Sequence, residues 1–402
     1  IKYIRITDFD DDGSVPGNEF ATVRIVEDRY RLANGDVLFA RSGATAGKTF
    51  IYSSDIGPAI FAGYCIRFRF DTKKALPTFI YFYTKTNRYL SWVRSIQRPS
   101  GQPNINKEEF KSFTIPLPKL SVQKELVAEM ERARAARRRK LEQADALLAS
   151  LDAFLLGRIG LTPRQKVYPL YFAACLGEAW NRCDPDFHSP KFKELRDSIE
   201  HCGHSVMPVG EICLSIKSGF AAGREMQAFD DVQGVPHIRP LNISAYGELG
   251  FEGTKYVPQE SVPESEIIQE GEVLLNNTNS TEWVGKSTVF DAKRVCCCSN
   301  HITRLALKPG VAFPWYLACF FNAIRSTGYL GLIATNFVNQ AGINTETISA
   351  LRVPVPESKI QLEIVNELRK RRLEARRLRE EAAREWEAAK ARFEARLLDQ
   401  GA

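Results

Sequence analysis

The chain has 402 residues, of which 44% are hydrophobic and 26% are charged, a composition typical of globular chains long enough for two or three domains. Its nine cysteines include no Cys-x-x-Cys pair and its longest apolar run, near residues 315–321, is too short to cross a bilayer, which argues against a disulfide scaffold, a zinc ribbon and a membrane-spanning helix. We therefore expect a cytoplasmic protein, and its formal net charge of +7 at pH 7 is compatible with nucleic acid without requiring it.

The first 118 residues are typical of short strands separated by turns. Runs rich in β-branched and aromatic residues occur at residues 20–26, 36–40, 49–52 and 65–70. These runs predict short strands of a curved sheet. Residues 77–85 begin with proline and continue with apolar and aromatic residues, which predicts a buried helix.

Residues 121–158 predict one long helix. The stretch has no proline, has no glycine before Gly157, and spaces its apolar or small residues three or four positions apart for most of its length. At ~1.5 Å per residue such a helix is about 50 Å long. The residues of this stripe are Val122, Leu126, Met130, Ala133, Leu141, Ala144, Leu148, Leu151 and Leu155.

So narrow a stripe on so long a helix requires a partner helix. The only comparable segment is residues 360–397, which repeat the pattern near the C-terminus. We predict that the two helices pack together as a spacer between globular modules. The alternative is that each helix docks separately on the surface of its own domain.

A second globular region lies between the long helices. Residues 161–181 are expected to be a connector. The lead-in that follows, at residues 182–236, predicts a helix at 191–202 and a strand near 210–216. Further strands are predicted at residues 273–275, 287–290 and 302–307, and a buried helix at residues 314–325.

The two globular regions are copies of one module. Ile105-Asn106, the Pro-x-Pro segment at 115–118 and Gln123 recur 238 residues later as Ile343-Asn344, residues 353–356 and Gln361. Shorter matches upstream recur at offsets of 234 to 238. One module is therefore used twice, each time followed by a long helix. Because the second copy's lead-in has no counterpart before Ile1, we expect the first copy to be incomplete at its N-terminus.

This pattern resembles the specificity (S) subunits of type I restriction–modification systems. The likeness is carried by residues 3–8, 35–48, 104–118 and Gln123 with their second-copy counterparts, and it covers essentially the whole chain. It implies an α/β (α+β) fold in which two mixed α/β target recognition domains are joined by two long helices forming an antiparallel coiled coil. It places the recognition domains at residues 1–118 (N-terminally incomplete) and 182–356, the helices at 119–160 and 357–402, and the connector at 161–181.

The resemblance also implies a function. In this family each target recognition domain reads one half of a bipartite target on double-stranded DNA, and the helices dock two methyltransferase (M) subunits at a fixed spacing. A motor–nuclease (R) subunit joins the complex for cleavage. Catalysis belongs to these partners, so the S subunit is expected to be non-catalytic, with no cofactor.

The residues themselves carry no catalytic signature. The chain lacks the Pro-Pro dipeptide of amino-methyltransferase loops and the Gly-x-Gly-x-x-Gly cofactor loop, and residues 43–49 are one residue short of a phosphate-binding loop. Residues 296–298 with His301, and residues 201–204, could suggest a metal site. Neighbouring residues on a strand point to opposite faces, so buried small side chains are the better interpretation of the three cysteines.

Polar loops at matching places in the two copies are the candidate DNA-binding sites. Arg, Lys, Asn and Gln read base edges, whereas Lys, Arg, Ser and Thr bind phosphates. The candidates of the first copy are Arg41, Ser42, Thr45, Lys48, Gln97, Arg98, Ser100, Gln102 and Asn104. Those of the second copy are Lys217, Asn276, Asn277, Thr278, Asn279, Thr281, Lys286, Asn336, Asn339 and Gln340. For any single residue, a position in a solvated turn is an equally good interpretation. For the loops taken together, the family resemblance favours DNA binding.

Other functions stay open at this point. Within the same class, the chain could be the recognition subunit of another bipartite restriction or phage-defence methyltransferase. A self-contained DNA methyltransferase or nuclease is opposed by the missing motifs. A helical scaffold that binds only protein would show no affinity for DNA.

Overall fold

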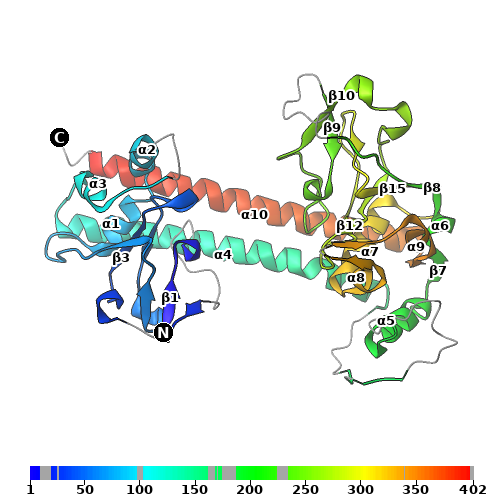
Figure 1. Ribbon diagram of the computed structural model, residues 1–402, viewed down its shortest axis with the longest axis horizontal. Coiled ribbons are helices and arrows are strands. Elements are labelled where there is room, and N and C mark those ends of the chain that lie inside the picture. The colour runs from blue at the N-terminus through cyan, green and yellow to red at the C-terminus, as the bar shows by residue number, and fades with distance from the viewer. Residues whose placement is uncertain are drawn as a thin grey trace. The chain divides into compact units, whose positions relative to one another are not determined.

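The computed structural model describes residues 1–9, 20–24, 27–96, 103–161, 168–169, 171–173, 187–223, 234–338 and 340–398. The chain combines helices with short strands and divides into two compact units (Figure 1). Unit 1 comprises Ile1–Ala144 and Arg376–Ala402, and unit 2 comprises Asp145–Ala375. Each long helix contributes one part to each unit.

The described residues of unit 1 form two small three-stranded sheets. In the first, the order is β2-β1-β5, where β1 (Lys2–Ile4) runs antiparallel to β2 (Ala21–Thr22) and parallel to β5 (Ala59–Phe61). In the second, the order is β4-β3-β6, where β3 (Val37–Ala40) runs antiparallel to β4 (Thr49–Ile51) and β6 (Cys65–Phe68). The 3-10 helices of this unit are η1 (Ile6–Asp8), η2 (Asp28–Tyr30), η3 (Gly43–Thr45) and η4 (Ser54–Ile56).

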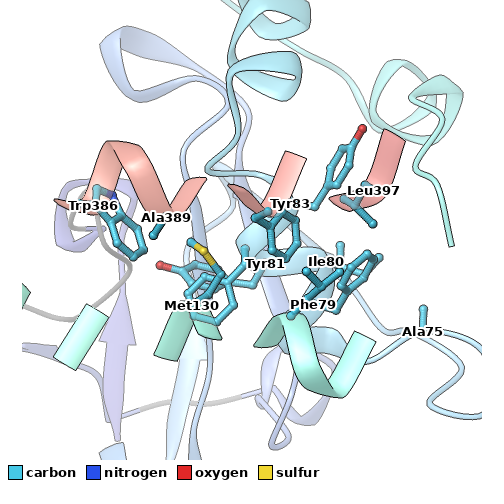
Figure 2. Packing of buried hydrophobic residues seen from close by; sticks show 12 residues of the cluster. Ala75, Phe79, Ile80, Tyr81, Tyr83, Met130, Trp386, Ala389 and Leu397 are labelled. Atoms are coloured by element: carbon cyan, nitrogen blue, oxygen red, sulfur yellow. The ribbon is translucent and has the colours of Figure 1, made fainter. Parts of the chain in front are cut away.

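The core of unit 1 forms around its first helix, α1 (Pro77–Tyr83). Residues 79–83 of α1 are all buried, as expected of a helix that is apolar on every side. They pack against Leu126 and Met130 of the helix α4 (Leu120–Arg158) and against Trp386 and Phe393 of the helix α10 (Ser358–Leu398) (Figure 2). Two further helices, α2 (Asn87–Ile96) and α3 (Lys107–Ser112), cover the second sheet through a separate cluster that includes Phe39, Tyr89 and Phe110.

The two long helices pack directly on each other inside each unit. In unit 1, Glu125 accepts a hydrogen bond from Arg396 at 2.9 Å, and Lys140 pairs with Glu381 at 3.2 Å. In unit 2, Arg371 donates to Ser150 Oγ at 2.9 Å, and Arg158 pairs with Glu363 at 2.7 Å. Since residue numbers rise along α4 while those of its partners fall, the pairing is antiparallel. The predicted helix pair is confirmed, and the alternative of two separately docked helices is wrong.

Unit 2 repeats the sheets of unit 1 and extends them. The order β10-β9-β14 joins β9 (Gly234–Ile238) antiparallel to β10 (Lys255–Pro258) and parallel to β14 (Cys297–Cys298). The order β13-β11-β15-β8 consists of β13 (Ser287–Val289), β11 (Val273–Asn276), β15 (Ile302–Leu307) and β8 (Cys213–Ser218), all antiparallel to their neighbours. A third sheet, in the order β12-β17-β16, comprises β12 (Thr278–Asn279), β17 (Gln340–Gly342) and β16 (Thr335–Phe337). A separate two-stranded sheet pairs β7 (Ser205–Pro208) with β18 (Arg352–Val355).

Among the described residues of unit 2, five helices surround these strands, in addition to the part of each long helix that belongs to the unit. They are α5 (Pro190–Glu200), α6 (Val209–Ile212), α7 (Pro314–Ser326), α8 (Tyr329–Ile333) and α9 (Thr345–Ala350), with 3-10 turns η7 (Pro240–Asn242), η8 (Gln259–Ser261) and η9 (Glu264–Glu266). The buried helix α7 lies against β11 and β13, as α1 lies against β4 in unit 1. The matching sheet orders and helices confirm the internal repeat predicted from the sequence.

The lead-in of the second copy differs from the prediction in one respect. Residues 209–212 form the short helix α6 rather than the start of a strand, and β8 begins at Cys213. Val209 and Ile212, three positions apart, are both fully buried on the same side of this turn. In unit 1, only residues 21–22 of the predicted strand at 20–26 form a strand, and residues 25–26 lie outside the described residues.

Candidate nucleic-acid interface

The two candidate loops of unit 1 lie side by side. Ser42 forms an antiparallel bridge with Asn104, although the two residues are far apart in the sequence. The backbone N–H of Gly43 donates to Pro103 O at 3.0 Å, and that of Ile105 donates to Arg41 O at 2.8 Å. Residues 41–48 and 103–105 therefore form one surface, which we call loop surface 1.

Two glycines shape loop surface 1. Gly43 and Gly47 have φ angles of 75° and 88°, which L side chains rarely adopt. At Gly47 a Cβ atom would lie 2.5 Å from Cγ1 of Val93, and the Gly47 carbonyl accepts a hydrogen bond from Tyr89 Oη at 2.8 Å. Gly47 is therefore committed to packing on α2, rather than to a phosphate cradle.

The candidate side chains of loop surface 1 differ in exposure. Lys48 and Asn104 are exposed, whereas Arg41, Ser42 and Thr45 are half-buried. The Thr45 hydroxyl is buried and has no hydrogen-bond partner among the described residues. Gln97, Arg98, Ser100 and Gln102 lie outside the described residues.

One exposed aromatic residue beside loop surface 1 was not predicted. Tyr64 is 64% exposed, and its carbonyl accepts a hydrogen bond from the Arg41 N–H at 2.9 Å. It lies in the turn between β5 and β6. An aromatic residue in a glycine-containing turn was the available signal in the sequence, and only the fold shows that this turn adjoins the loop.

The same arrangement recurs in unit 2. The backbone N–H of Ile343 donates to Asn277 O at 2.8 Å, in the manner of Ile105 and Arg41. The sheet β12-β17-β16 brings the loop after Asn277 next to the hairpin of β16 and β17, with Thr278 opposite Gly342. Thr281 Oγ1 also donates to Asn336 Oδ1 at 3.5 Å. We call residues 277–281 and 335–342 loop surface 2, of which Asn339 lies outside the described residues.

Three candidates in unit 2 use their polar groups inside the fold. The buried Asn277 amide donates to Asn300 O at 3.0 Å and to Thr303 Oγ1 at 2.9 Å. Asn276, also buried, donates to Trp283 O at 3.1 Å. Lys286 Nζ donates to two backbone carbonyls, those of Pro240 at 2.9 Å and Ile243 at 2.7 Å. Burial lowers the pKa of Lys286, and the neighbouring Arg325 charge lowers it further.

The remaining candidates of unit 2 are accessible. Thr281, Asn336 and Gln340 are exposed, and Thr278 and Asn279 are half-buried. The exposed Lys217 lies on β8 rather than on loop surface 2, and its Nζ donates to Ser265 O at 3.2 Å. The structure thus brings together Thr278, Asn279, Thr281, Asn336 and Gln340, and places Lys217 on β8, the edge strand of a different sheet.

The hairpin of loop surface 2 also exposes apolar side chains. Phe337 and Val338 are 65% and 97% exposed, next to the polar Asn336. Nothing in the sequence marks them as exposed, because an apolar pair usually indicates a buried strand. Exposed apolar groups beside hydrogen-bonding ones suit contacts to thymine methyl groups or insertion between bases.

The groups of cysteine and histidine residues considered as metal sites form no site comparable with the two loop surfaces. Cys296, Cys297 and Cys298 are all fully buried, and burial raises the pKa of the Cys296 thiol to about 11 and that of Cys297 to about 12. Within the described ranges there is no cluster of three or more His, Cys, Asp or Glu side chains that could hold a metal ion. The same part of the chain contains no helix that is long and apolar enough to span a membrane.

Comparisons with known proteins place these surfaces in context. Residues 2–143 match the family model of the type I restriction modification DNA specificity domain. A structure described as the basis of complex assembly and conformational transition of the type I R-M system is similar over 99% of this chain and 90% of that chain, with 18% sequence identity and a TM-score of 0.56. At that identity, the likeness shows a shared fold.

Two further solved structures match over similar lengths. The HsdS subunit from Thermoanaerobacter tengcongensis matches with 18% identity and a TM-score of 0.41, over 99% of this chain and 89% of that chain. The type I restriction–modification S subunit from M. genitalium matches with 10% identity and a TM-score of 0.45, over 98% of this chain and 87% of that chain. No curated protein sequence matches the chain.

Proposed function

We propose that this chain, whose residues 2–143 match the family model of the type I restriction modification DNA specificity domain, is the DNA sequence-specificity subunit of a type I restriction–modification complex. The observation that carries the proposal is the pairing of two polar loops in each unit. Ile105 N–H to Arg41 O and Ile343 N–H to Asn277 O are equivalent bonds, each 2.8 Å long. The same backbone scaffold therefore presents different side chains in the two copies.

To read two different half-sites, the two copies must present different side chains on the same backbone scaffold. Loop surface 1 offers Arg41, Lys48 and Asn104, and loop surface 2 offers Asn336 and Gln340. Arg and Lys suit guanine, whereas Asn and Gln suit adenine, in the major groove. Asn276, Asn277 and Lys286 hold the loop in place through internal bonds, so we assign them a positioning role rather than a contact with DNA.

The long helices supply the remaining parts of the proposal. Recognition domains at residues 1–118 and 182–356 would be joined through the helices at 119–160 and 357–402 and the connector at 161–181. Because α4 and α10 each take part in both units, their lengths would set the number of base pairs between the half-sites. Exposed Leu362 and Leu373 on α10 are apolar groups of the kind that a protein partner covers.

The partners we propose are two methyltransferase subunits and a motor–nuclease subunit, with double-stranded DNA as the target. Support comes from the solved structure of similar fold, which is described as the structural basis underlying complex assembly and conformational transition of the type I R-M system. Methyl transfer and cleavage would belong to these subunits, and the chain itself would act in the cytoplasm as a non-catalytic targeting subunit without a cofactor. Purified chain that transferred methyl groups unaided would contradict this assignment.

The decisive experiment is to co-express the chain with the methyltransferase encoded beside it and to map the methylated bases. We expect one bipartite motif, with two short specified parts separated by an unspecified stretch. Replacing residues 276–286 with the equivalent loop of another specificity subunit should change one part only. A continuous motif, or a change in both parts, would refute the division of labour between the two units.

A further inference from the structure

The small sheet of loop surface 2 places an aromatic ring and an amide on the same face. Between β16 and β17, Phe337 lies directly opposite Gln340, and Thr335 lies opposite Gly342. The pairing of β12 with β17 sets Thr278 opposite Gly342 as well. Directly paired residues, and alternate residues of one strand, share a face of a sheet, so these five residues lie together.

The Phe337 side chain is exposed and yet packs on the sheet. Phe337 is 65% exposed. A Cβ atom on Gly342 would lie 3.3 Å from Cε2 of Phe337 and 4.0 Å from Oγ1 of Thr278. Because Gly342 has no side chain, the ring rests against the backbone of β17 beside Thr278. The rest of its surface is open to a partner.

The next residue extends this apolar surface. Val338 is 97% exposed at the end of the hairpin, and the exposed polar residues Asn336 and Gln340 lie on either side of the pair. An exposed apolar group with a polar rim is typical of a binding surface. Since it is continuous with the amides of loop surface 2, we expect the apolar pair and the amides to meet the same partner.

Loop surface 2 carries no charge. Residues 277–281 and 335–342 include no Lys, Arg, His, Asp or Glu, whereas loop surface 1 contains Arg41 and Lys48. In the major groove, guanine is read chiefly by arginine or lysine, and adenine by asparagine or glutamine. The composition of loop surface 2 therefore favours an A·T pair over a G·C pair.

An A·T pair offers one group to an amide and another to an apolar side chain. Adenine presents N6 and N7 for a bidentate amide, and thymine presents its C5-methyl group. Phe337 and Gln340 supply one partner for each, and the Cβ atoms of directly opposite residues are only about 4.5–5.5 Å apart. Insertion of the ring between base pairs is the rival mode of binding, and it does not depend on the methyl group.

We propose that Phe337, with Val338 beside it, contacts the methyl group of a thymine in the half-site read by unit 2, next to an adenine held by Gln340. This assignment rests on the proposed function and adds the chemical character of one half-site to it. Binding buries the methyl group against the ring. Removing that methyl group therefore weakens binding without disturbing the base pair or its hydrogen bonds.

The test replaces each thymine of the methylated target, one at a time, by deoxyuridine, which lacks only the C5-methyl group. Binding of each duplex to the complete methyltransferase complex is measured by titration. In the half-site that changes when residues 276–286 are replaced, one substitution should weaken binding about fourfold, the loss expected for one buried methyl group. The Phe337→Ala complex should bind the thymine duplex more weakly and should bind the corresponding uracil duplex equally well. Substitutions in the other half-site should affect both complexes alike.

Two further variants separate this contact from a general effect on folding. Leu214→Ala removes an apolar side chain of similar exposure, 67%, from β8 in a different sheet, and it should keep the full preference for thymine. Phe337→Leu keeps an apolar group at the same position and should keep part of the preference. A variant that had merely lost its fold would bind neither duplex.

Equal binding of the thymine and uracil duplexes by the unaltered complex would overturn the inference, and so would a half-site without thymine. Both results leave sequence-specific binding intact, whereas failure of the proposed function would leave no bipartite target to test. If Phe337→Ala instead released the methyltransferase subunits, the apolar pair would belong to a protein interface and the inference would be wrong.

Discussion

The side chain of Gln123 holds the backbone of Leu76, whose N–H donates to Gln123 Oε1 at 2.9 Å. The Gln123 amide in turn donates to Lys74 O at 2.9 Å and to Pro118 O at 2.8 Å. Gln361 repeats this in unit 2, accepting from Phe313 N–H at 2.9 Å and donating to Pro356 O at 2.8 Å. In each unit one buried amide thus ties the start of the long helix to the residue that precedes the buried helix.

Gln123→Ala should lower the free energy of unfolding of unit 1 by about 1–3 kcal/mol, because it leaves buried backbone groups without partners. The measurement is urea denaturation followed by a signal from unit 1. Lys124→Ala, at the exposed neighbouring position, should change the free energy by no more than about 0.5 kcal/mol. If both substitutions lowered the free energy of unfolding equally, the hydrogen bonds of Gln123 would not be what stabilises unit 1 here.

Phe393→Ala should destabilise unit 1 more strongly. Phe393 is 1% exposed, and its ring centre lies 5.5 Å from that of Phe79 on α1. Removing a buried phenyl ring costs about 3–5 kcal/mol, through lost burial and the cavity left behind. Leu398→Ala on the same helix is the control, since Leu398 is 62% exposed and should cost little. If both variants unfold at the same urea concentration, α10 does not contribute to this core.

His237 should make unit 2 less stable in mild acid. Burial lowers the pKa of His237, and the Arg239 and Lys255 charges lower it further, against the effect of a 3.3 Å contact with Phe220 O. The unfolded chain, with a histidine pKa of about 6.5, therefore takes up the proton first as the pH falls. The stabilisation is complete above that value and is lost as the pH falls toward the lower pKa of the folded state.

The check is denaturation of the wild-type chain and of His237→Gln at pH 7.5, 6.5 and 5.5. Because glutamine does not titrate, the stability advantage of the wild type over the variant should shrink as the pH falls. A constant difference between wild type and His237→Gln would show that His237 does not contribute to the pH dependence.

If the proposed function holds, Asn336→Ala and Gln340→Ala should weaken recognition of one half-site. A good bidentate contact is worth about 1–3 kcal/mol of discrimination against the wrong base. The measurement is binding of the methyltransferase complex to targets substituted in one half at a time. Asn277→Ala is the contrasting variant: it should lower the stability of unit 2, because the Asn277 amide bonds to Asn300 O and Thr303 Oγ1. Loss of discrimination at both halves would contradict the assignment of loop surface 2 to one half-site.

Much of the fold could be predicted because its signals are local. The stripe at Leu126, Met130 and Leu148 has helical spacing whatever lies around it, and α4 runs from Leu120 to Arg158, within one residue of the prediction. The Ile-Asn motif of the repeat is also explained locally. Asn106 and Asn344 cap α3 and α9, with their side chains accepting hydrogen bonds from the backbone of Glu109 and Thr347.

The role of each polar loop residue could not be predicted in the same way. Asn276 and Asn277 look in the sequence like the exposed Asn336, yet both are buried, and the Asn277 amide donates to Asn300 O, 23 positions away. Lys286, a candidate phosphate ligand, is held by the carbonyls of Pro240 and Ile243. Whether a polar side chain is free for DNA depends on partners that come from elsewhere in the chain.

The sequence by itself determined the repeat, the two long helices and the class of fold, because hydrophobic spacing and capping residues act over a few neighbouring positions. Only the tertiary structure decided that Ser42 meets Asn104 and that Tyr64 and Phe337 are exposed beside the loops. The physical reason is that hydrogen bonding and burial are settled by contacts between segments far apart in the chain, which no local pattern encodes.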